Sequence, residues 1–342
     1  MYLEDLYNQI EKAIKKVDFE KLWHGFKPFK FALYNEEECY FNGEYIEKTS
    51  EFVANTAIIY NGEYIAIWNA QEDMEIDIFA SKMIHEMFHA FQYQNDWPSF
   101  PKEMEALFRY KYNKENLSIK LHENELLLEL AECFDRAKYN ELLKCRKYRS
   151  QKYVYEYQYE ACVEDIEGSA SYVEWMVLKQ LNPQKADMLF EDMKATMIQS
   201  EYFFPIRISS YYTGALMINC VLQALDEVYN PAVRPLSISL VEQIDFENIS
   251  IENHQVTKAL EDFQTETERI INSALELNEI VLDGPAVMKC VNIYNARHKE
   301  EYITSTFFLA FTVGEKDQVK MGNFVIKMAD EHTIEKVYHW PM

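Results

Sequence analysis

The chain has 342 residues, of which 48% are hydrophobic and 27% are charged, so it can bury a substantial core and is not disordered. Its 34 Lys and Arg against 57 Asp and Glu give a net charge of −23. Such a charge repels nucleic-acid phosphates and anionic lipid surfaces, so we expect neither a nucleic-acid partner nor a membrane. The low numbers of Gly (8) and Pro (9) favour long regular elements.

The cysteines and the N-terminus bear on the compartment. None of the six cysteines forms a Cys-x-x-Cys pair, and we expect buried, reduced thiols in a reducing compartment. The N-terminal residues mix charges with apolar positions and lack the uninterrupted apolar run of a signal peptide. No run approaches the roughly 18 apolar residues of a membrane span. The sequence therefore predicts a soluble, cytoplasmic protein.

The first seventy residues combine a helix with strands. Apolar residues at helical spacing predict an amphipathic helix over 2–24. Asn-Gly pairs at 42–43 and 61–62 then lie between β-branched and aromatic runs. Because a type I′ turn needs positive φ at both central residues, Asn-Gly is a strong hairpin signal. We expect a hairpin of strands 53–60 and 63–69.

The rest of the chain is predicted to be helical and then to return to strands. A three- and four-residue period predicts a helix from about residue 72 that ends before residue 95. Further helical stretches are expected over 102–143, 157–179, 212–229 and 251–277, and strands from 286 to the end. The predicted class is α+β: an antiparallel or mixed sheet, a helical body and a β-rich C-terminal region. The expected divisions are 1–72, 73–235 and 236–342.

Residues 85–89 read His-Glu-Met-Phe-His, an H-E-x-x-H pattern on an expected helix. Four residues along an α-helix advance about 400°, so the two imidazoles lie about 40° apart and about 6 Å along one face. That spacing lets His85 and His89 reach one Zn²⁺ at about 2.0–2.1 Å. Glu86 points about 100° away from His85, beside the metal, where it can take a proton from water.

The pentapeptide alone leaves alternatives open. Two histidines on the buried face of a helix can also be hydrogen-bonded core residues, and the other six histidines lack ligand spacing. A catalytic zinc site needs a third protein ligand, and the segment 160–174 offers carboxylates on a second expected helix. An ordinary acidic helix face is the other interpretation of that segment.

Residues 167–174 read Glu-Gly-Ser-Ala-Ser-Tyr-Val-Glu, and with H-E-x-x-H they resemble the gluzincin metallopeptidases, the thermolysin-like and aminopeptidase N-like clan. In the aminopeptidase N-like branch, a downstream helix carries N-E-G-F-A-x-Y/F-x-E, whose Glu binds the metal. The resemblance covers roughly residues 50–225 and implies a zincin-like catalytic domain. It implies one Zn²⁺ per chain, held by His85, His89 and Glu167, with Glu86 as general base.

The same branch has a Y-x-x-G-a-l segment, which residues 210–216 (Ser-Tyr-Tyr-Thr-Gly-Ala-Leu) resemble. There the Tyr hydroxyl donates to the oxyanion that develops on the substrate. The resemblance implies this role for Tyr211, three positions before Gly214, with Tyr212 as the fallback. A packing or surface role for Tyr211 is the alternative, because the chain has 24 Tyr.

The chain also departs from the family pattern. It has no G-x-M-E-N motif for a free amine, and the interval 90–166 between the ligand segments is longer than in the aminopeptidase N-like branch. Ser171 stands where the thermolysin-type E-x-x-x-D pattern has an Asp. Glu164 and Glu174 are therefore the candidate hydrogen-bond partners of a ligand histidine, and Glu164 and Glu160 are the alternative third ligands.

The sequence thus predicts a zinc metallopeptidase that acts on a peptide or protein substrate. In this clan the strand before the H-E-x-x-H helix is the edge to which a peptide adds by backbone hydrogen bonds. The hairpin 53–69 occupies that place in the sequence, or serves only the core. Two other functions stay open: an inactive zincin-fold binding or regulatory protein, and a zinc hydrolase of a non-peptide substrate. Nothing in the sequence indicates the oligomeric state.

Overall fold

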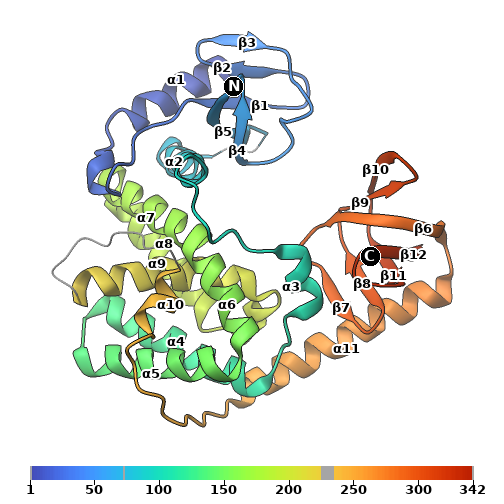
Figure 1. Cartoon of the computed structure of the whole chain (residues 1–342). Helices are drawn as coiled ribbons and strands as arrows, with labels where there is room; N and C mark the ends of the chain where they lie inside the picture. Colours follow the sequence, from blue (N-terminus) through green and yellow to red (C-terminus); the bar gives the residue numbers. More distant parts are fainter. Residues whose placement is uncertain (1, 72–73, 225–234, 341–342) are drawn as a thin grey trace.

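The computed structural model describes residues 2–71, 74–224 and 235–340. Three parts follow one another along the chain: an N-terminal sheet with helix α1 against it, a body of helices, and a C-terminal sheet beside a long helix (Figure 1). The predicted α+β class is confirmed, as are the helical body and the β-rich C-terminal region.

The N-terminal sheet has the strand order β3-β2-β1-β5-β4, so β4 lies at an edge. The strands are β1 (Phe31–Tyr34), β2 (Cys39–Phe41), β3 (Glu44–Ile46), β4 (Thr56–Tyr60) and β5 (Glu63–Asn69). β1 and β5 run parallel and the other neighbours antiparallel, which makes the sheet mixed. Both Asn-Gly pairs form turns with positive φ at each residue, and the predicted hairpin is confirmed.

The single helix predicted over 2–24 is wrong in its second half. Helix α1 (Leu3–Ile14) ends early, and only a short 3-10 turn, η1 (Phe19–Lys21), follows. The apolar residues that follow α1 are nevertheless buried. Their helix-like spacing therefore arises from a non-helical segment that packs against the core. On the sheet side, Tyr7 of α1 stacks on Phe31 with ring centroids 4.2 Å apart.

The helical body spans residues 76–224. Its helices are α2 (Ile76–Gln94), α3 (Glu103–Arg109), α4 (Lys114–Glu132), α5 (Arg136–Lys152), α6 (Val154–Val163), α7 (Ser169–Leu181), α8 (Pro183–Met197) and α9 (Ile206–Ala224), with a 3-10 turn η3 (Ser200–Phe203). The continuous helical stretch predicted over 102–143 is wrong, because two caps divide it. The side chains of Asn113 and Asp135 accept hydrogen bonds from the first amides of α4 and α5.

Two further boundaries differ from the prediction. Helix α8 was not predicted, although Asn182 caps it and Pro183 occupies its first turn, which is a recognisable start signal. Helix α9 begins at Ile206 rather than near Tyr212. Its predicted end near Tyr229 lies outside the described residues.

A single π-helical turn, η2 (Glu164–Gly168), joins α6 to α7 where a continuous helix was expected. Such turns occur mostly inside α-helices and frequently at functional sites. η2 touches α9 closely: a Cβ on Gly214 would lie 2.6 Å from the Glu164 carbonyl oxygen and 2.8 Å from the Gly168 Cα atom. Glycine at both positions therefore lets α9 pack directly against the π turn.

Several charged side chains are buried together inside the helical body, and we call them the buried ionic network. They are Lys120, Glu123, Arg146, Arg149, Glu160 and Glu164. Arg146 donates to both carboxylate oxygens of Glu164, at 2.8 and 2.9 Å, and Arg149 joins Glu123 to Glu160. Because Glu164 belongs to η2, the network anchors the π turn to α5.

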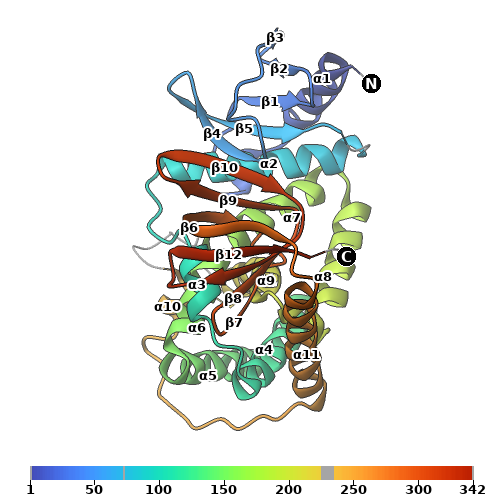
Figure 2. The ribbon, with the colours of Figure 1, turned by 90° about the vertical axis from the view of Figure 1, so that its right-hand side faces the viewer.

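The C-terminal part follows the short helix α10 (Leu236–Leu240) and the long helix α11 (His254–Leu277). Its strands are β6 (Ile280–Val291), β7 (Arg297–Lys299), β8 (Tyr302–Ser305), β9 (Phe308–Val313), β10 (Lys316–Met321), β11 (Phe324–Met328) and β12 (Thr333–His339), in the order β10-β9-β6-β12-β11-β8-β7. All neighbouring strands are antiparallel. Helix α3 packs into the core of this sheet, which stands in front of the helical body in Figure 2.

The helices and the cysteines bear on the expected absence of a membrane span and on the expected reduced thiols. No helix in the described ranges has both the length and the apolar character to cross a membrane. The six cysteines are unpaired thiols, as expected. Cys39, Cys145 and Cys220 are buried, but Cys133 and Cys290 are exposed, so the expectation of buried thiols is wrong for these two.

Candidate metal centre

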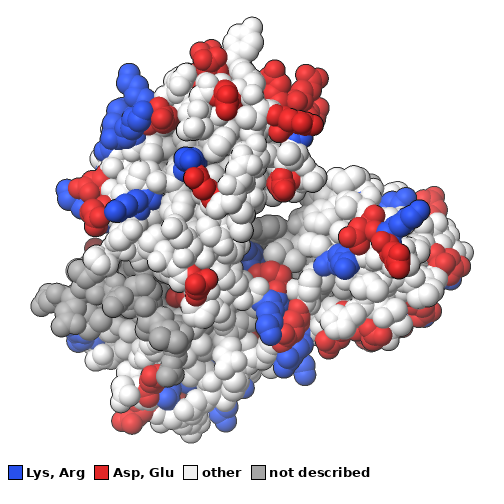
Figure 3. Space-filling view, turned by 45° about the horizontal axis from the view of Figure 1, so that its top comes forward, with Lys and Arg blue, Asp and Glu red and all other residues white. Residues whose placement is uncertain are grey.

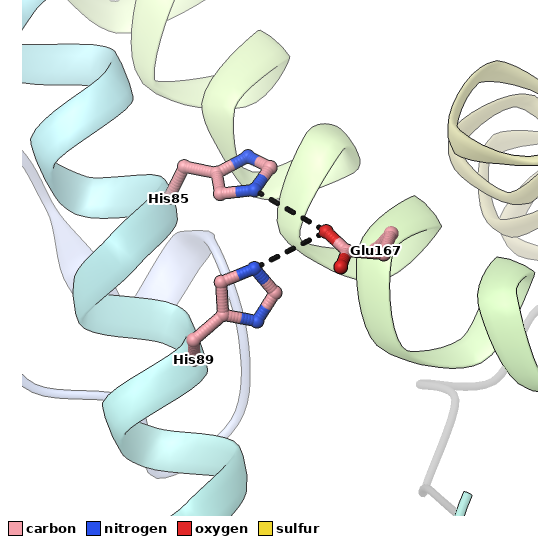
Figure 4. A group of neighbouring side chains, drawn as sticks. All are labelled: His85, His89 and Glu167. Atoms are coloured by element: carbon pink, nitrogen blue, oxygen red, sulfur yellow. Dashed lines mark ion pairs between the residues drawn. The ribbon is translucent and has the colours of Figure 1, made fainter. Parts of the chain in front are cut away.

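Two histidines of α2 and one glutamate of the π turn converge on one point. His85 and His89 lie one helical turn apart and direct their Nε2 atoms toward the same carboxylate oxygen of Glu167 (Figure 4). The distances from Nε2 to Oε2 are 3.9 Å for His85 and 3.3 Å for His89. One ligand atom from each residue lies within 4.8 Å of the others. The fold therefore brings together the three residues that were expected to bind metal.

The other ring nitrogen of each histidine also has a partner. His85 Nδ1 lies 3.1 Å from Glu174 Oε2, and His89 Nδ1 lies 2.7 Å from Gln92 Oε1. Gln92 in turn donates from Nε2 to a backbone carbonyl of η2 at 2.8 Å. When Nδ1–H donates to such an acceptor, Nε2 keeps its lone pair for a metal and the ring orientation is fixed.

A cation holds the second oxygen of Glu167. Arg207 of α9 donates from Nη2 to Glu167 Oε1 at 2.5 Å, and its guanidinium also pairs with Glu103 at the start of α3. Both contacts are largely shielded from solvent, since the Arg207 side chain is buried. Glu167 therefore turns Oε2 toward the histidines while Oε1 is occupied.

Two carboxylates that the sequence offered as alternatives do not reach this point. Glu164 and Glu160 belong to the buried ionic network, where Arg146 and Arg149 hold them. Burial alone would raise the pKa of Glu164, but Arg146 and Lys120 keep it well below its usual range. Glu174, rather than Glu164, is the carboxylate that contacts a histidine of the candidate site.

The electrostatics of the centre favour a cation. Burial alone would lower the pKa of His85, but the carboxylates of Glu167 and Glu174 raise it to about 10. Burial would raise the pKa of Glu167, yet the two histidines and Arg207 hold it well below its usual range. Two imidazole nitrogens and one carboxylate oxygen form a donor set typical of catalytic Zn²⁺. The residues present therefore fit a zinc ion.

Glu86 lies where the H-E-x-x-H pattern predicts it. It is buried, lines the cleft together with His85 and His89, and stands outside the group of convergent ligand atoms. Burial raises the pKa of Glu86, although the two histidines partly offset this effect. A carboxylate with a raised pKa is better matched to proton transfer near neutral pH.

Tyr211 lines the same cleft as the candidate ligands His85, His89 and Glu167. Its hydroxyl accepts a hydrogen bond from Arg207 Nη2 at 3.0 Å and lies 3.0 Å from the hydroxyl of Tyr294. Burial, with the charge of Glu167, raises the pKa of Tyr211 well above its usual value, so the hydroxyl keeps its proton. Tyr212 lines only the part of the cleft next to Glu174.

An open cleft of about 500 Å³ lies over the ligands. Residues 54 and 55 and the first residue of the edge strand β4, Thr56, form one wall, and Tyr294 of the C-terminal part lines another. Figure 3 shows the surface hollowed between the N-terminal part and the C-terminal part. A smaller hollow of about 250 Å³ continues past His85 and Glu86 toward Trp68.

No protein-family model matches the chain, and comparison with curated proteins and with solved structures gives no significant match. Function is therefore inferred from the residues and the geometry of the cleft. Sequence patterns missed Gln92, Arg207 and Tyr294, which contact the expected site residues. Gln92 stands three positions after His89 on α2, and Arg207 stands four positions before Tyr211 on α9, so helical spacing was a local signal for both.

Proposed function

We propose that the protein is a zinc-dependent metallopeptidase of the gluzincin type with a zincin-like catalytic domain. The convergence of His85, His89 and Glu167 beneath an open cleft carries the proposal, with Glu86 beside them. Structural zinc sites are closed by four protein ligands, whereas catalytic sites use three and leave a position open. The described residues supply three, and they face a cleft large enough for a substrate.

Each residue has a chemical role in this proposal. His85, His89 and Glu167 would hold Zn²⁺, which when bound polarises the scissile carbonyl and lowers the pKa of water toward about 7. Glu86 takes the proton of the attacking water and passes it to the leaving amine. The protonated hydroxyl of Tyr211 donates to the oxyanion that develops on the substrate.

The cleft suggests how a peptide would lie. Strand β4 is at the edge of its sheet, and the residues that precede and begin it, 54–56, line the cleft. An edge strand presents unpaired backbone N–H and C=O groups, to which an extended peptide can add as a further strand. A peptide held there would pass over the metal ligands, which favours a peptide over a compact small molecule as substrate.

Metal content tests the ligand set. The full chain, purified without added metal and without a His-tag, is expected to contain about one zinc by elemental analysis. His85→Ala and Glu167→Ala should lose most of it, while Glu105→Ala on α3, which removes a partly exposed carboxylate outside the ligand group, should keep it. Zinc that persists in Glu167→Ala would remove Glu167 from the ligand set.

Peptide cleavage tests the catalytic role of Glu86. Zinc-loaded wild type is expected to cleave members of a peptide library, and Glu86→Gln should lower the rate by roughly 10²–10⁴-fold while zinc stays bound. Glu105→Gln on α3, a partly exposed carboxylate outside the ligand group, is the matched control and should be unchanged. Bound zinc without turnover of any peptide would favour the scaffold or the non-peptide hydrolase instead.

A further inference from the structure

The turn between β6 and β7 carries Tyr294 from the C-terminal part to the candidate metal centre. The Tyr294 hydroxyl lies 3.0 Å from the hydroxyl of Tyr211, and the guanidinium of Arg207 lies 5.7 Å from its ring centroid. Its side chain is about half exposed, at 47%, and lines the same cleft as the metal ligands. The β-rich C-terminal part therefore forms a wall of the cleft and contacts the expected oxyanion donor.

Hydrogen-bond capacity gives this contact a direction. A guanidinium can only donate, so the bond between Arg207 and Tyr211 uses one acceptor position of the Tyr211 oxygen. A tyrosine hydroxyl has one proton to donate and further capacity to accept. If Tyr294 donates, Tyr211 accepts from both neighbours and its own proton is free for the substrate. If Tyr211 donates to Tyr294 instead, its proton is withdrawn from the substrate.

The position of the turn is fixed from both sides. Helix α3 packs Leu107 and Phe108 into the core of the C-terminal sheet, while Glu103 at its start pairs with Arg207. On the opposite side, Arg297 donates from Nη1 to the Phe263 carbonyl on α11 at 3.2 Å. These contacts fix the position of the C-terminal sheet relative to α9, which carries Tyr211.

We propose that Tyr294 is a positioning residue for the proposed hydrolysis. Its hydroxyl donates to the Tyr211 oxygen and so directs the Tyr211 proton toward the developing oxyanion. This inference rests on the proposed peptidase function. The inference gives the C-terminal part a role in the reaction. The chain before β6 supplies the metal ligands and the general base, and Tyr294, between β6 and β7, orients the oxyanion donor Tyr211. The reaction sequence itself is unchanged, since Tyr294 exchanges no proton with the substrate.

The test uses the zinc-loaded full chain as wild type, Tyr294→Phe, Tyr211→Phe and the double variant. Tyr302→Phe is the control, because Tyr302 packs beside α11 in the C-terminal part. For a peptide that wild type cleaves, kcat and KM are measured together with the Kd of a phosphinic peptide of the same sequence. A phosphinic group mimics the tetrahedral oxyanion, so its Kd reports on the donor independently of turnover.

The expected result is that Tyr294→Phe lowers kcat about fivefold to tenfold with KM unchanged, and weakens phosphinate binding by a similar factor. Because Tyr294 acts through Tyr211, the double variant should be no worse than Tyr211→Phe, and the Tm of each variant should match that of Tyr302→Phe. With an active wild type, three results would overturn the inference. Tyr294→Phe could leave kcat and phosphinate binding unaffected, it could change KM alone, or the losses in kcat of the two single variants could multiply in the double variant. A wild type that neither cleaves peptides nor binds the phosphinate would overturn the proposed function itself.

Discussion

Arg207 and Glu167 form an ion pair in which Arg207 Nη2 lies 2.5 Å from Glu167 Oε1, on the side of the carboxylate that faces away from the histidines. The pair has two effects on the candidate centre. It fixes the rotation of the carboxylate, so that Oε2 points at the histidine nitrogens, and it offsets part of the negative charge around the site. The orientation of the Glu167 carboxylate therefore depends on a residue of another helix.

Replacement of Arg207 by Met should weaken zinc binding. The apolar side chain keeps much of the length but leaves Glu167 Oε1 without its donor, so the carboxylate can rotate. Loss of a group that orients a metal ligand typically costs 10–100-fold in affinity. A competition titration with a chromogenic chelator measures the effect. Arg269→Met, which removes an exposed ion pair on α11, is the control; equal affinities for the two variants would contradict this role.

Removal of the Glu174 carboxylate should also weaken zinc binding, by roughly 10–100-fold, because His85 Nδ1 would lose its acceptor. The variant Glu174→Ala tests this expectation by the same titration. Ser171→Ala, one helical turn earlier on α7, is the control because Ser171 lines the neighbouring hollow. If both variants bind zinc as wild type does, Glu174 has no part in orienting the ligand.

Substitution of Gly214 by Ala should destabilise the fold and disturb the site together. The new methyl would lie 2.6 Å from a backbone oxygen of η2, so the turn that carries Glu167 has to move. Overpacking of this kind costs about 1–3 kcal/mol. Thermal unfolding and zinc content are the measurements, with Asn219→Ala on the same helix as control. Unchanged Tm and zinc content in Gly214→Ala would show that the contact tolerates a methyl group.

The buried ionic network should make a large contribution to stability that depends on pH. Glu164→Gln removes the carboxylate that accepts two hydrogen bonds from Arg146, and leaves only the more distant Glu123, 3.7 Å from Arg146 Nε. Breaking a buried pair typically costs about 3–5 kcal/mol. The ion pair lowers the pKa of Glu164 below its ordinary value of 4.5, so the contribution is complete above that pH. It is lost as the pH falls through the folded-state pKa.

Urea unfolding of wild type and Glu164→Gln at several pH values tests this expectation. The difference in stability should be largest near neutral pH and should shrink as the pH falls below about 4.5. The double variant Arg146→Met/Glu164→Met, which removes both charges, should recover part of the loss. A difference that grows toward acid pH would contradict the assignment.

Local patterns were enough to predict the parts of the fold that local physics determines. The Asn-Gly turns follow from backbone conformation, and the placing of His85 and His89 on one face of α2 follows from helical spacing, so both were found at the expected places. Helix boundaries failed where the hydrophobic pattern ran through a cap. Asn113 and Asp135 cap new helices within the stretch 102–143. Asn and Asp are favoured N-cap residues because the side-chain oxygen accepts from the first helical amides, so both residues signalled a helix start.

Contacts between distant segments could not be predicted in this way. Arg207, Glu103 and Tyr294 reach the cleft from α9, α3 and the β6–β7 turn, and no spacing in the sequence links these positions. The π turn was equally hidden, because its residues read as ordinary helix. Resemblance to a known motif suggested Glu167, but only tertiary packing distinguishes it from Glu164, three residues earlier.

The π turn η2 has a consequence for attempts to transplant the centre into another scaffold. Two of its five residues have different partners: Glu164 is anchored by Arg146, while Glu167 faces the histidines. Grafting H-E-x-x-H and a downstream Glu onto two designed helices would reproduce the sequence motif but not the Arg146–Glu164 ion pair that holds the π turn in place. A faithful graft would have to carry the π turn, its glycine contact and its arginine partners as one unit, since each determines where the carboxylate points.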